Sequence, residues 1–203
     1  MDTVLGVAMS PMTVRMVLVE GENADGVTVN QDNFDLTTNG GAPTITAPDQ
    51  VISAILGTRE NAADGGYQLK STGVTWADPA EAAALREGLA VRKIENVMLV
   101  SAFLAAAALA QAVGKATNYA RTALLFVEPD SATLAVVNTA DGSVADVRRR
   151  SRPEDDDEAV AELVEMVTGV AEMEAHPAGV FVVGSGVDIA PIKPALRRGC
   201  RFR

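Results

Sequence analysis

The order of strand-like and helix-like segments constrains this chain most, because the same order begins twice along its 203 residues. The first half predicts strands at 4–7, 14–19, 27–36, 68–76 and 96–100, and helices at 48–63, 79–93 and 103–115. The second half predicts strands at 123–128, 133–138, 143–149 and 179–183, and helices at 154–173 and 191–198. This repeated order predicts an α/β fold with two similar lobes, 1–119 and 120–203, of which the second lacks its last strand.

Composition narrows the classes of protein and partner. Apolar residues make up 48% of the chain and aromatic residues only 4%, which favours close-packed α/β layers over an aromatic binding surface. A net charge of −10 argues against nucleic acid as a partner, because phosphate neutralisation needs clustered Lys and Arg. The apolar run 97–113 is short for a membrane span and contains Ser101 and Gln111, so a buried strand and helix is expected there, without direct membrane insertion.

The single cysteine, Cys200, and the single histidine, His176, cannot form a disulfide framework or a zinc site. The opening residues show no signal-peptide pattern, since Met1-Asp2 leads directly into a strand. Together these features predict a cytoplasmic protein. Cys200 lies beside arginines that would lower a thiol pKa, but an inert thiol is the simpler expectation.

Three turn motifs connect the predicted strands at points where a ligand could approach the backbone. The first is the hairpin 6–11, the second is the acidic turn 128–131, and the third is the strand-to-helix turn Gly184-Ser185-Gly186. Turns of this kind can present backbone N–H groups to anions. The second and third also have purely structural interpretations, because Pro-Asp-Ser makes a tight hairpin and Gly-x-Gly makes a tight strand-to-helix connection.

Taken in order, these motifs resemble the two phosphate elements and the adenosine element of the actin and heat-shock-chaperone ATPase superfamily. The resemblance implies two tandem ribonuclease H-like lobes with strand and helix order βββαβαβα, and it implies ATP and magnesium as ligands. The implied nucleotide-binding residues are Ser10, Thr13, Asp130, Ser131, Gly184, Ser185 and Gly186, and the implied magnesium ligands are Glu128 and Asp130. The alanine-rich stretch 101–110 resembles the connecting helix between the lobes.

The chain departs from the superfamily pattern at both phosphate elements. Ala8 stands where the magnesium-organising Asp would be, and Ser10-Pro11 replaces a flexible Gly-Thr turn. Proline removes a backbone donor from that turn. In the second element, Pro129-Asp130 occupies the glycine turn, and the added carboxylate repels phosphate unless a metal intervenes. No residue is therefore expected to be catalytic.

Three functions remain open at this point. The first is a degenerate ATPase-fold module that acts as a protein-interaction scaffold with weak or no nucleotide binding. The second is an active magnesium-ATP-dependent ATPase of the chaperone or actin type. The third is a cytoplasmic platform that recruits a membrane machine. The partner in the first and third cases is an unidentified protein, and a homo-oligomer is also compatible with the sequence.

Two further features of the sequence are a second family resemblance and a pair of oppositely charged runs. The segments 1–7 and 14–26 resemble a mycobacterial protein family, and the resemblance covers most of the chain and implies the same fold without a particular activity. The basic run 148–152 precedes the acidic run 154–158. These runs are expected to neutralise each other in a solvated loop before a helix, and a docking site for an acidic partner is the alternative.

Overall fold

The computed structural model describes residues 1–36 and 46–199, and it divides into two compact units, Met1–Ala102 and Phe103–Arg203. Each unit is described by itself. The first contains β1 (Asp2–Met9), β2 (Thr13–Glu20), β3 (Thr28–Asp35), α1 (Ala47–Asp64), β4 (Gln68–Trp76), α2 (Pro79–Val91) and β5 (Val97–Ser101). The second contains α3 (Ala102–Thr117), β6 (Arg121–Val127), β7 (Ser131–Asn138), β8 (Val144–Ser151), α4 (Asp156–Thr168), β9 (Val180–Gly184) and α5 (Ile192–Gly199).

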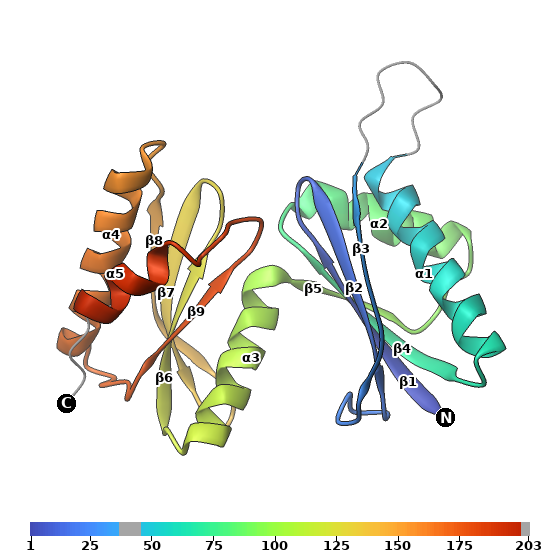
Figure 1. Cartoon of the computed structure of the whole chain (residues 1–203), viewed down its shortest axis with the longest axis horizontal. Helices are drawn as coiled ribbons and strands as arrows, with labels where there is room; N and C mark the ends of the chain where they lie inside the picture. The colour runs from blue at the N-terminus through green and yellow to red at the C-terminus, as the bar shows by residue number, and fades with distance from the viewer. Residues whose placement is uncertain (37–45, 200–203) are drawn as a thin grey trace. The chain divides into compact units, whose positions relative to one another are not determined.

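The first unit is a five-stranded sheet in the order β3-β2-β1-β4-β5, with α1 and α2 on one face (Figure 1). Strands β1, β2 and β3 pair antiparallel, whereas β4 runs parallel to β1 and β5 parallel to β4. Alternate residues of the central strands point at the helices and form the core with them. The buried side chains of this core include Leu5, Val7, Met9, Val14, Met16, Val74, Ile52, Ile55 and Leu85.

Both helices of the first unit begin at the caps that their sequences indicate. The hydroxyl of Thr46 accepts a hydrogen bond from Asp49 N, and the carboxylate of Asp78 accepts one from Ala80 N. In both helices a proline lies at one of the first two positions, where its missing N–H costs nothing. Capping by polar side chains therefore explains why these helices start where they do.

Asp49 also joins the start of α1 to the end of α2. The Thr46 hydroxyl donates to Asp49 Oδ2 at 2.7 Å, and Arg92 Nη2 donates to Asp49 Oδ1 at 2.8 Å. These contacts, the Thr46 hydroxyl first and the Arg92 guanidinium next, lower the pKa of Asp49 below its ordinary value. A carboxyl group whose pKa is lower in the folded than in the unfolded state stabilises the fold at pH values above the unfolded-state pKa. This stabilisation is lost as the pH falls through the folded-state pKa.

We therefore expect Asp49→Asn to lower the melting temperature of the first unit at neutral pH. The difference from wild type should shrink through the acid range below the ordinary pKa of 3.8. Fluorescence of Trp76, the single tryptophan, can follow the unfolding of this unit. A melting-temperature difference that stays constant from neutral to acid pH would contradict the proposed role of the charge.

The second unit has a four-stranded sheet in the order β8-β7-β6-β9, covered on both faces. Helices α4 and α5 pack on one face, where Leu163, Met166 and Ile192 join alternate residues of β6 and β7 in a hydrophobic core. Two expectations for this region were wrong. The helix predicted over 154–173 ends at Thr168 and continues as a short 3₁₀ helix from Gly169. Of the basic run 148–152, which was expected in a loop, residues 148–151 belong to β8 and only Arg152 lies outside it.

Helix α3 covers the opposite face of the second sheet. The ring of Phe103 meets that of Phe126 edge-on, with centroids 6.0 Å apart, and Gln111 Nε2 donates to Thr139 O at 3.1 Å. Gly114 approaches Thr122 and Thr139 so closely that an added Cβ would collide with their hydroxyls. The compact units accordingly divide after Ala102, so α3 groups with the second unit and not with the segment 1–119 in which the sequence placed it.

The two units repeat one topology. Strands β1 to β4 correspond in order, direction and pairing to β6 to β9, and within the described residues only the first unit has a fifth strand. The expected α/β fold with two ribonuclease H-like lobes is confirmed. Cys200 and the rest of the segment 200–203, considered as the beginning of a fifth strand in the second unit, lie outside the described residues. No helix in the described ranges is long and apolar enough to cross a membrane.

Candidate functional site

The hairpin turn between β1 and β2 is closed by its own side chains. Ser10 Oγ lies 2.7 Å from Thr13 Oγ1 and accepts a hydrogen bond from Thr13 N at 3.2 Å. Ser10 N donates to Thr13 O at 2.9 Å, and Pro11 has no N–H to offer. Ser10 and Thr13, both expected to line a phosphate site, therefore bond to each other, while the exposed side chain of Met12 occupies the tip of the turn.

The turn between β6 and β7 is held by an arginine of β8. Glu128 N donates to Ser131 O at 2.8 Å, which makes the turn tight. Arg149 Nη2 donates to Ser131 Oγ at 2.9 Å and lies 3.6 Å from Glu128 Oε2, and Ser131 Oγ donates to the same carboxylate at 3.2 Å. Glu128, Ser131 and Arg149 thus form one hydrogen-bonded group, in which the Glu128 side chain is only 18% exposed.

A second arginine, Arg152, donates hydrogen bonds to the backbone of the same turn. Arg152 Nη1 donates to Pro129 O at 3.1 Å, and Arg152 N donates to Asp130 O at 2.8 Å. The side chain of Asp130 remains exposed at the tip. The role of Glu128 and Asp130 as magnesium ligands stays a prediction, and among the described residues no group of three or more His, Cys, Asp or Glu is arranged to hold a metal ion.

The third motif lies directly beside this acidic turn. Strand β9 runs parallel to β6 with Gly184 opposite Val127, and Ser185 N donates to Val127 O at 2.8 Å. Both turns therefore meet at the carboxyl ends of parallel strands, the usual place for a ligand in open α/β sheets. The glycines also have structural reasons, since Gly186 has a φ of 69° and a Cβ at Gly184 would lie 2.5 Å from Val187 O.

The structure thus brings Glu128, Asp130 and Ser131 together with the turn 184–186 in the second unit, while Ser10 and Thr13 lie in the first. Sequence reasoning missed Arg149 as a member of this group. The signal that could have found it is strand alternation: Arg149 lies opposite Thr133, so it points to the other face of β8 from Arg148 and Arg150.

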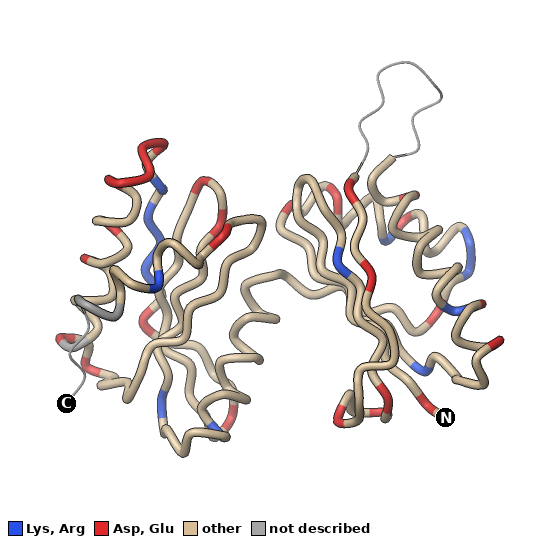
Figure 2. The backbone as a smooth tube through the Cα atoms, viewed as in Figure 1, with Lys and Arg blue, Asp and Glu red and all other residues tan. Residues whose placement is uncertain are grey.

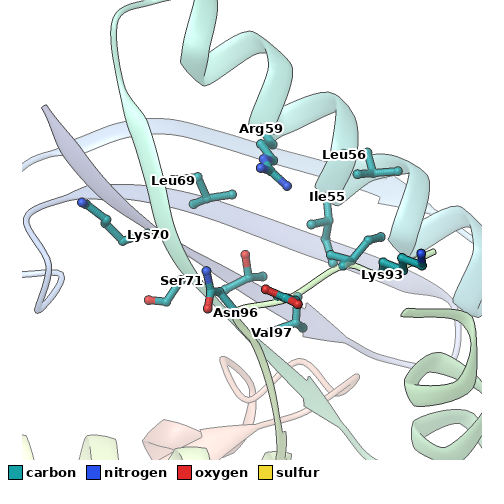
Figure 3. Close-up of a pocket in the computed structure, with 12 residues that line it drawn as sticks. Ile55, Leu56, Arg59, Leu69, Lys70, Ser71, Lys93, Asn96 and Val97 are labelled. Atoms are coloured by element: carbon teal, nitrogen blue, oxygen red, sulfur yellow. The ribbon is translucent and has the colours of Figure 1, made fainter. Parts of the chain in front are cut away.

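Figure 3 shows a pocket of about 180 Å³ in the first unit. It is lined by α1, β4 and the segment 93–97, and Arg59 extends toward it from α1. The lining residues Leu69 to Thr72 belong to the amino-terminal half of β4. The turn 10–13 follows the carboxyl end of β1, which runs parallel to β4, so the pocket lies at the opposite end of this sheet.

Comparison with solved structures identifies the fold. The chain superimposes on a ROK hexokinase from Thermus thermophilus with a TM-score of 0.57 and 14% identity, covering 97% of this chain and 87% of that one. It matches a Bacteroides thetaiotaomicron protein with an actin-like ATPase fold and unknown function with a TM-score of 0.51 and 8% identity, covering 97% and 87%. A Ppx/GppA phosphatase from Aquifex aeolicus matches with a TM-score of 0.54 and 10% identity, covering 91% of this chain and 67% of that chain.

These likenesses establish an actin-like ATPase fold and, at such low identity, the fold alone. No curated protein matches the sequence. A family model does match almost the whole chain, over residues 2–202, and its description is a family of unknown function, DUF7159. The chain therefore belongs to this family.

Proposed function

We propose that this chain is a degenerate actin-like ATPase-fold module that serves as a protein-interaction scaffold, with weak or no nucleotide binding and no ATP turnover. One observation carries the proposal: side chains of the chain itself satisfy both hairpin turns that would hold phosphate and metal. The partner is a protein, and neither nucleic acid nor direct membrane insertion enters the proposal.

The first-unit turn supports this because phosphate would have to compete with bonds already made. Ser10 N and Thr13 N both donate within the turn, and Pro11 offers no replacement donor. Opening each bond costs about 1 kcal/mol net, and more if a buried group is left unpaired. Ala8 provides no carboxylate on β1 that could position a metal-bound water beside the turn.

The second-unit turn supports it for an electrostatic reason. A magnesium ion on Glu128 would have to displace the Arg149 guanidinium or bind next to its positive charge. Phosphoryl transfer depends almost entirely on positioned positive charge and an oriented nucleophile. A carboxylate that is already neutralised by arginine is a poor metal ligand, which favours a structural role for the Glu128–Arg149 pair.

The position of the third motif favours a second candidate, a magnesium-dependent ATPase. The Ser185 N to Val127 O bond sets the turn 184–186 beside Glu128 at the carboxyl ends of β6 and β9. Under this alternative the turn would receive adenosine, and Glu128 or Asp130 would hold the metal. It requires Arg149 to move away from Glu128 when nucleotide binds.

Titration of the full chain with ATP, with and without magnesium, separates the two candidates. We expect no saturable heat in calorimetry and no rise in melting temperature at millimolar ATP. If the ATP dissociation constant were about 10 μM, 1 mM ATP would stabilise the fold by about 2.7 kcal/mol, which a thermal shift detects easily.

Magnesium-dependent binding in the micromolar range would overturn the scaffold proposal. In that case Glu128→Gln and Asp130→Ala should abolish the magnesium dependence. The matched control is Asp146→Asn, which removes an exposed carboxylate near the other end of β8 and should leave binding unchanged.

A further inference from the structure

The pocket of the first unit has an apolar floor. Helix α1, the amino-terminal half of β4 and the connection from α2 to β5 each contribute to it. Ile55 is a buried core residue, and the other apolar lining residues are half-buried and pack against the same core: Leu56, Leu69, Ile94 and Val97. A ligand with an apolar body would therefore contact the edge of the hydrophobic core.

Backbone hydrogen bonds fix the connection that forms one wall of the pocket. Ile94 N donates to Leu89 O at 3.0 Å, a bond typical of a helix that ends with one residue in the left-handed conformation. That residue is Lys93, with a φ of 52°. Thr72 N donates to Asn96 O at 2.8 Å, which ties the far end of the connection to β4. This wall is therefore formed before any ligand arrives.

The charge around the pocket differs from the charge of the unit that contains it. Residues 1–102 include thirteen Asp and Glu but only six Lys and Arg, and acidic positions accordingly outnumber basic ones in the first unit of Figure 2. Three of those basic residues line the pocket, whereas Glu95 is the one acidic residue among the described residues that line it. A local excess of positive charge in an acidic unit favours an anion as the ligand.

Arg59 and Lys93 are the cations available to such an anion. The third basic residue, Lys70, lies 3.6 Å from Asp2 Oδ2, and its ammonium end points away from Arg59 in Figure 3. The side chains of Arg59 and Lys93 form no hydrogen bond or ion pair with any other described residue, Glu95 included, and the segments 37–45 and 200–203 contain no Asp or Glu. A guanidinium without a partner offers paired N–H donors that match the two oxygens of a carboxylate.

We propose that this pocket binds a small aliphatic carboxylate, with the carboxylate on Arg59 and Lys93 and the carbon chain against the apolar floor. The volume of about 180 Å³ suits such a ligand, since a cavity of about 150 Å³ accommodates a benzene-sized body. A nucleotide is far larger. The inference goes beyond the proposed function and does not depend on it, because it uses neither hairpin turn, so the two proposals fail separately.

Titration of the full chain with hexanoate tests the proposal. We expect saturable binding in calorimetry with a dissociation constant of about 1 mM, as befits a ligand of this size. Acetate supplies the charge without the chain, and 1-hexanol supplies the chain without the charge, so each should bind at least about tenfold more weakly. Equal binding of hexanoate and 1-hexanol, or no saturable binding of hexanoate in the low millimolar range, would overturn the proposal.

Substitution of the two cations tests their roles. Arg59→Gln should raise the dissociation constant of hexanoate about tenfold, and Lys93→Gln about threefold. Both side chains are exposed, so neither substitution empties the core. The matched control is Arg86→Gln, which removes an exposed positive charge of α2 outside the pocket and should leave the dissociation constant unchanged. Equal effects of Arg59→Gln and Arg86→Gln would show a general effect of net charge and contradict a specific site.

Amide chemical shifts locate the bound ligand in the wild-type chain. Hexanoate should shift the amide resonances of residues 69–72 and 93–97 saturably, because these segments line the pocket. The resonances of β6 in the second unit should not move. Binding without shifts at 69–72 and 93–97, or with its largest shifts in the second unit, would refute this pocket as the carboxylate site.

Discussion

Replacing Gly184 by alanine is expected to destabilise the second unit by about 3 kcal/mol. The new Cβ would lie 2.5 Å from Val187 O and 2.7 Å from Ile189 Cγ2. The carbonyl belongs to the backbone and cannot move aside as a flexible side chain could. The turn that follows β9 must therefore widen, which disturbs the Ser185 N to Val127 O bond and the docking of α5.

Chemical unfolding followed by far-UV circular dichroism measures this loss. Trp76 lies in the first unit, so its fluorescence should report an unchanged transition and serve as an internal control. Gly57→Ala is the matched variant: it adds the same methyl group within α1, where no atom lies within 4 Å, and should be neutral or slightly stabilising. Equal effects of the two substitutions would contradict the close approach at Gly184.

Phe126→Ala is expected to cost about 4 kcal/mol, the largest effect of any single substitution considered for this protein. The ring is 2% exposed and lies between the sheet of the second unit and α3. Its removal leaves a cavity that the sheet cannot fill and takes away the edge-on contact with Phe103. Chemical unfolding followed by far-UV circular dichroism is the measurement, and the second unit of the variant should unfold at a lower denaturant concentration than that of wild type.

A double-mutant cycle then tests whether α3 packs on this sheet. Phe126→Ala and Phe103→Ala should couple by about 1 kcal/mol, because each residue loses the same aromatic contact. The control cycle pairs Phe103→Ala with Leu125→Ala, which empties a buried position on the α4 face of the same strand. That cycle should be additive. Coupling of similar size in both cycles would argue against a specific contact between α3 and β6.

The sheet topology and the two hairpin turns of this protein point in different directions for nucleotide binding. The sheets keep the topology of an actin-like ATPase fold, yet the two hairpin turns hold Ser10–Thr13 and Glu128–Arg149 contacts where open backbone donors and free carboxylates would be needed. Backbone donors that are already bonded within their own turn are not free to bind an anion without breaking those bonds. The scaffold proposal rests on these closed turns.

Most of the secondary structure could be predicted because it depends on local patterns. Strand β4 was predicted at its observed bounds, since β-branched and aromatic residues alternate between turn residues there. Helix α2 begins at Pro79 after the Asp78 cap, as expected from the Asp-Pro-x-Glu pattern. The end of α4 was missed because Gly169 interrupts a sequence that otherwise continues the helical pattern.

The candidate site could be predicted only in part. The neighbourhood of the acidic turn and the turn 184–186 follows from strand order, because parallel strands bring their carboxyl ends to one edge. The contact of Arg149 with Glu128 did not follow, since it joins the turn after β6 to β8, and these two strands are not neighbours in the sheet. Pairing register, which no local pattern specifies, determines that contact.

By itself, the sequence determined the elements, their repeated order, the fold class and the loss of an Asp at Ala8, because each depends on residue type and spacing within a few turns of chain. Tertiary structure alone decided that α3 packs on the second sheet and that Arg149 pairs with Glu128. The physical reason is that packing and side-chain pairing depend on sheet register and three-dimensional proximity, which local propensity does not encode.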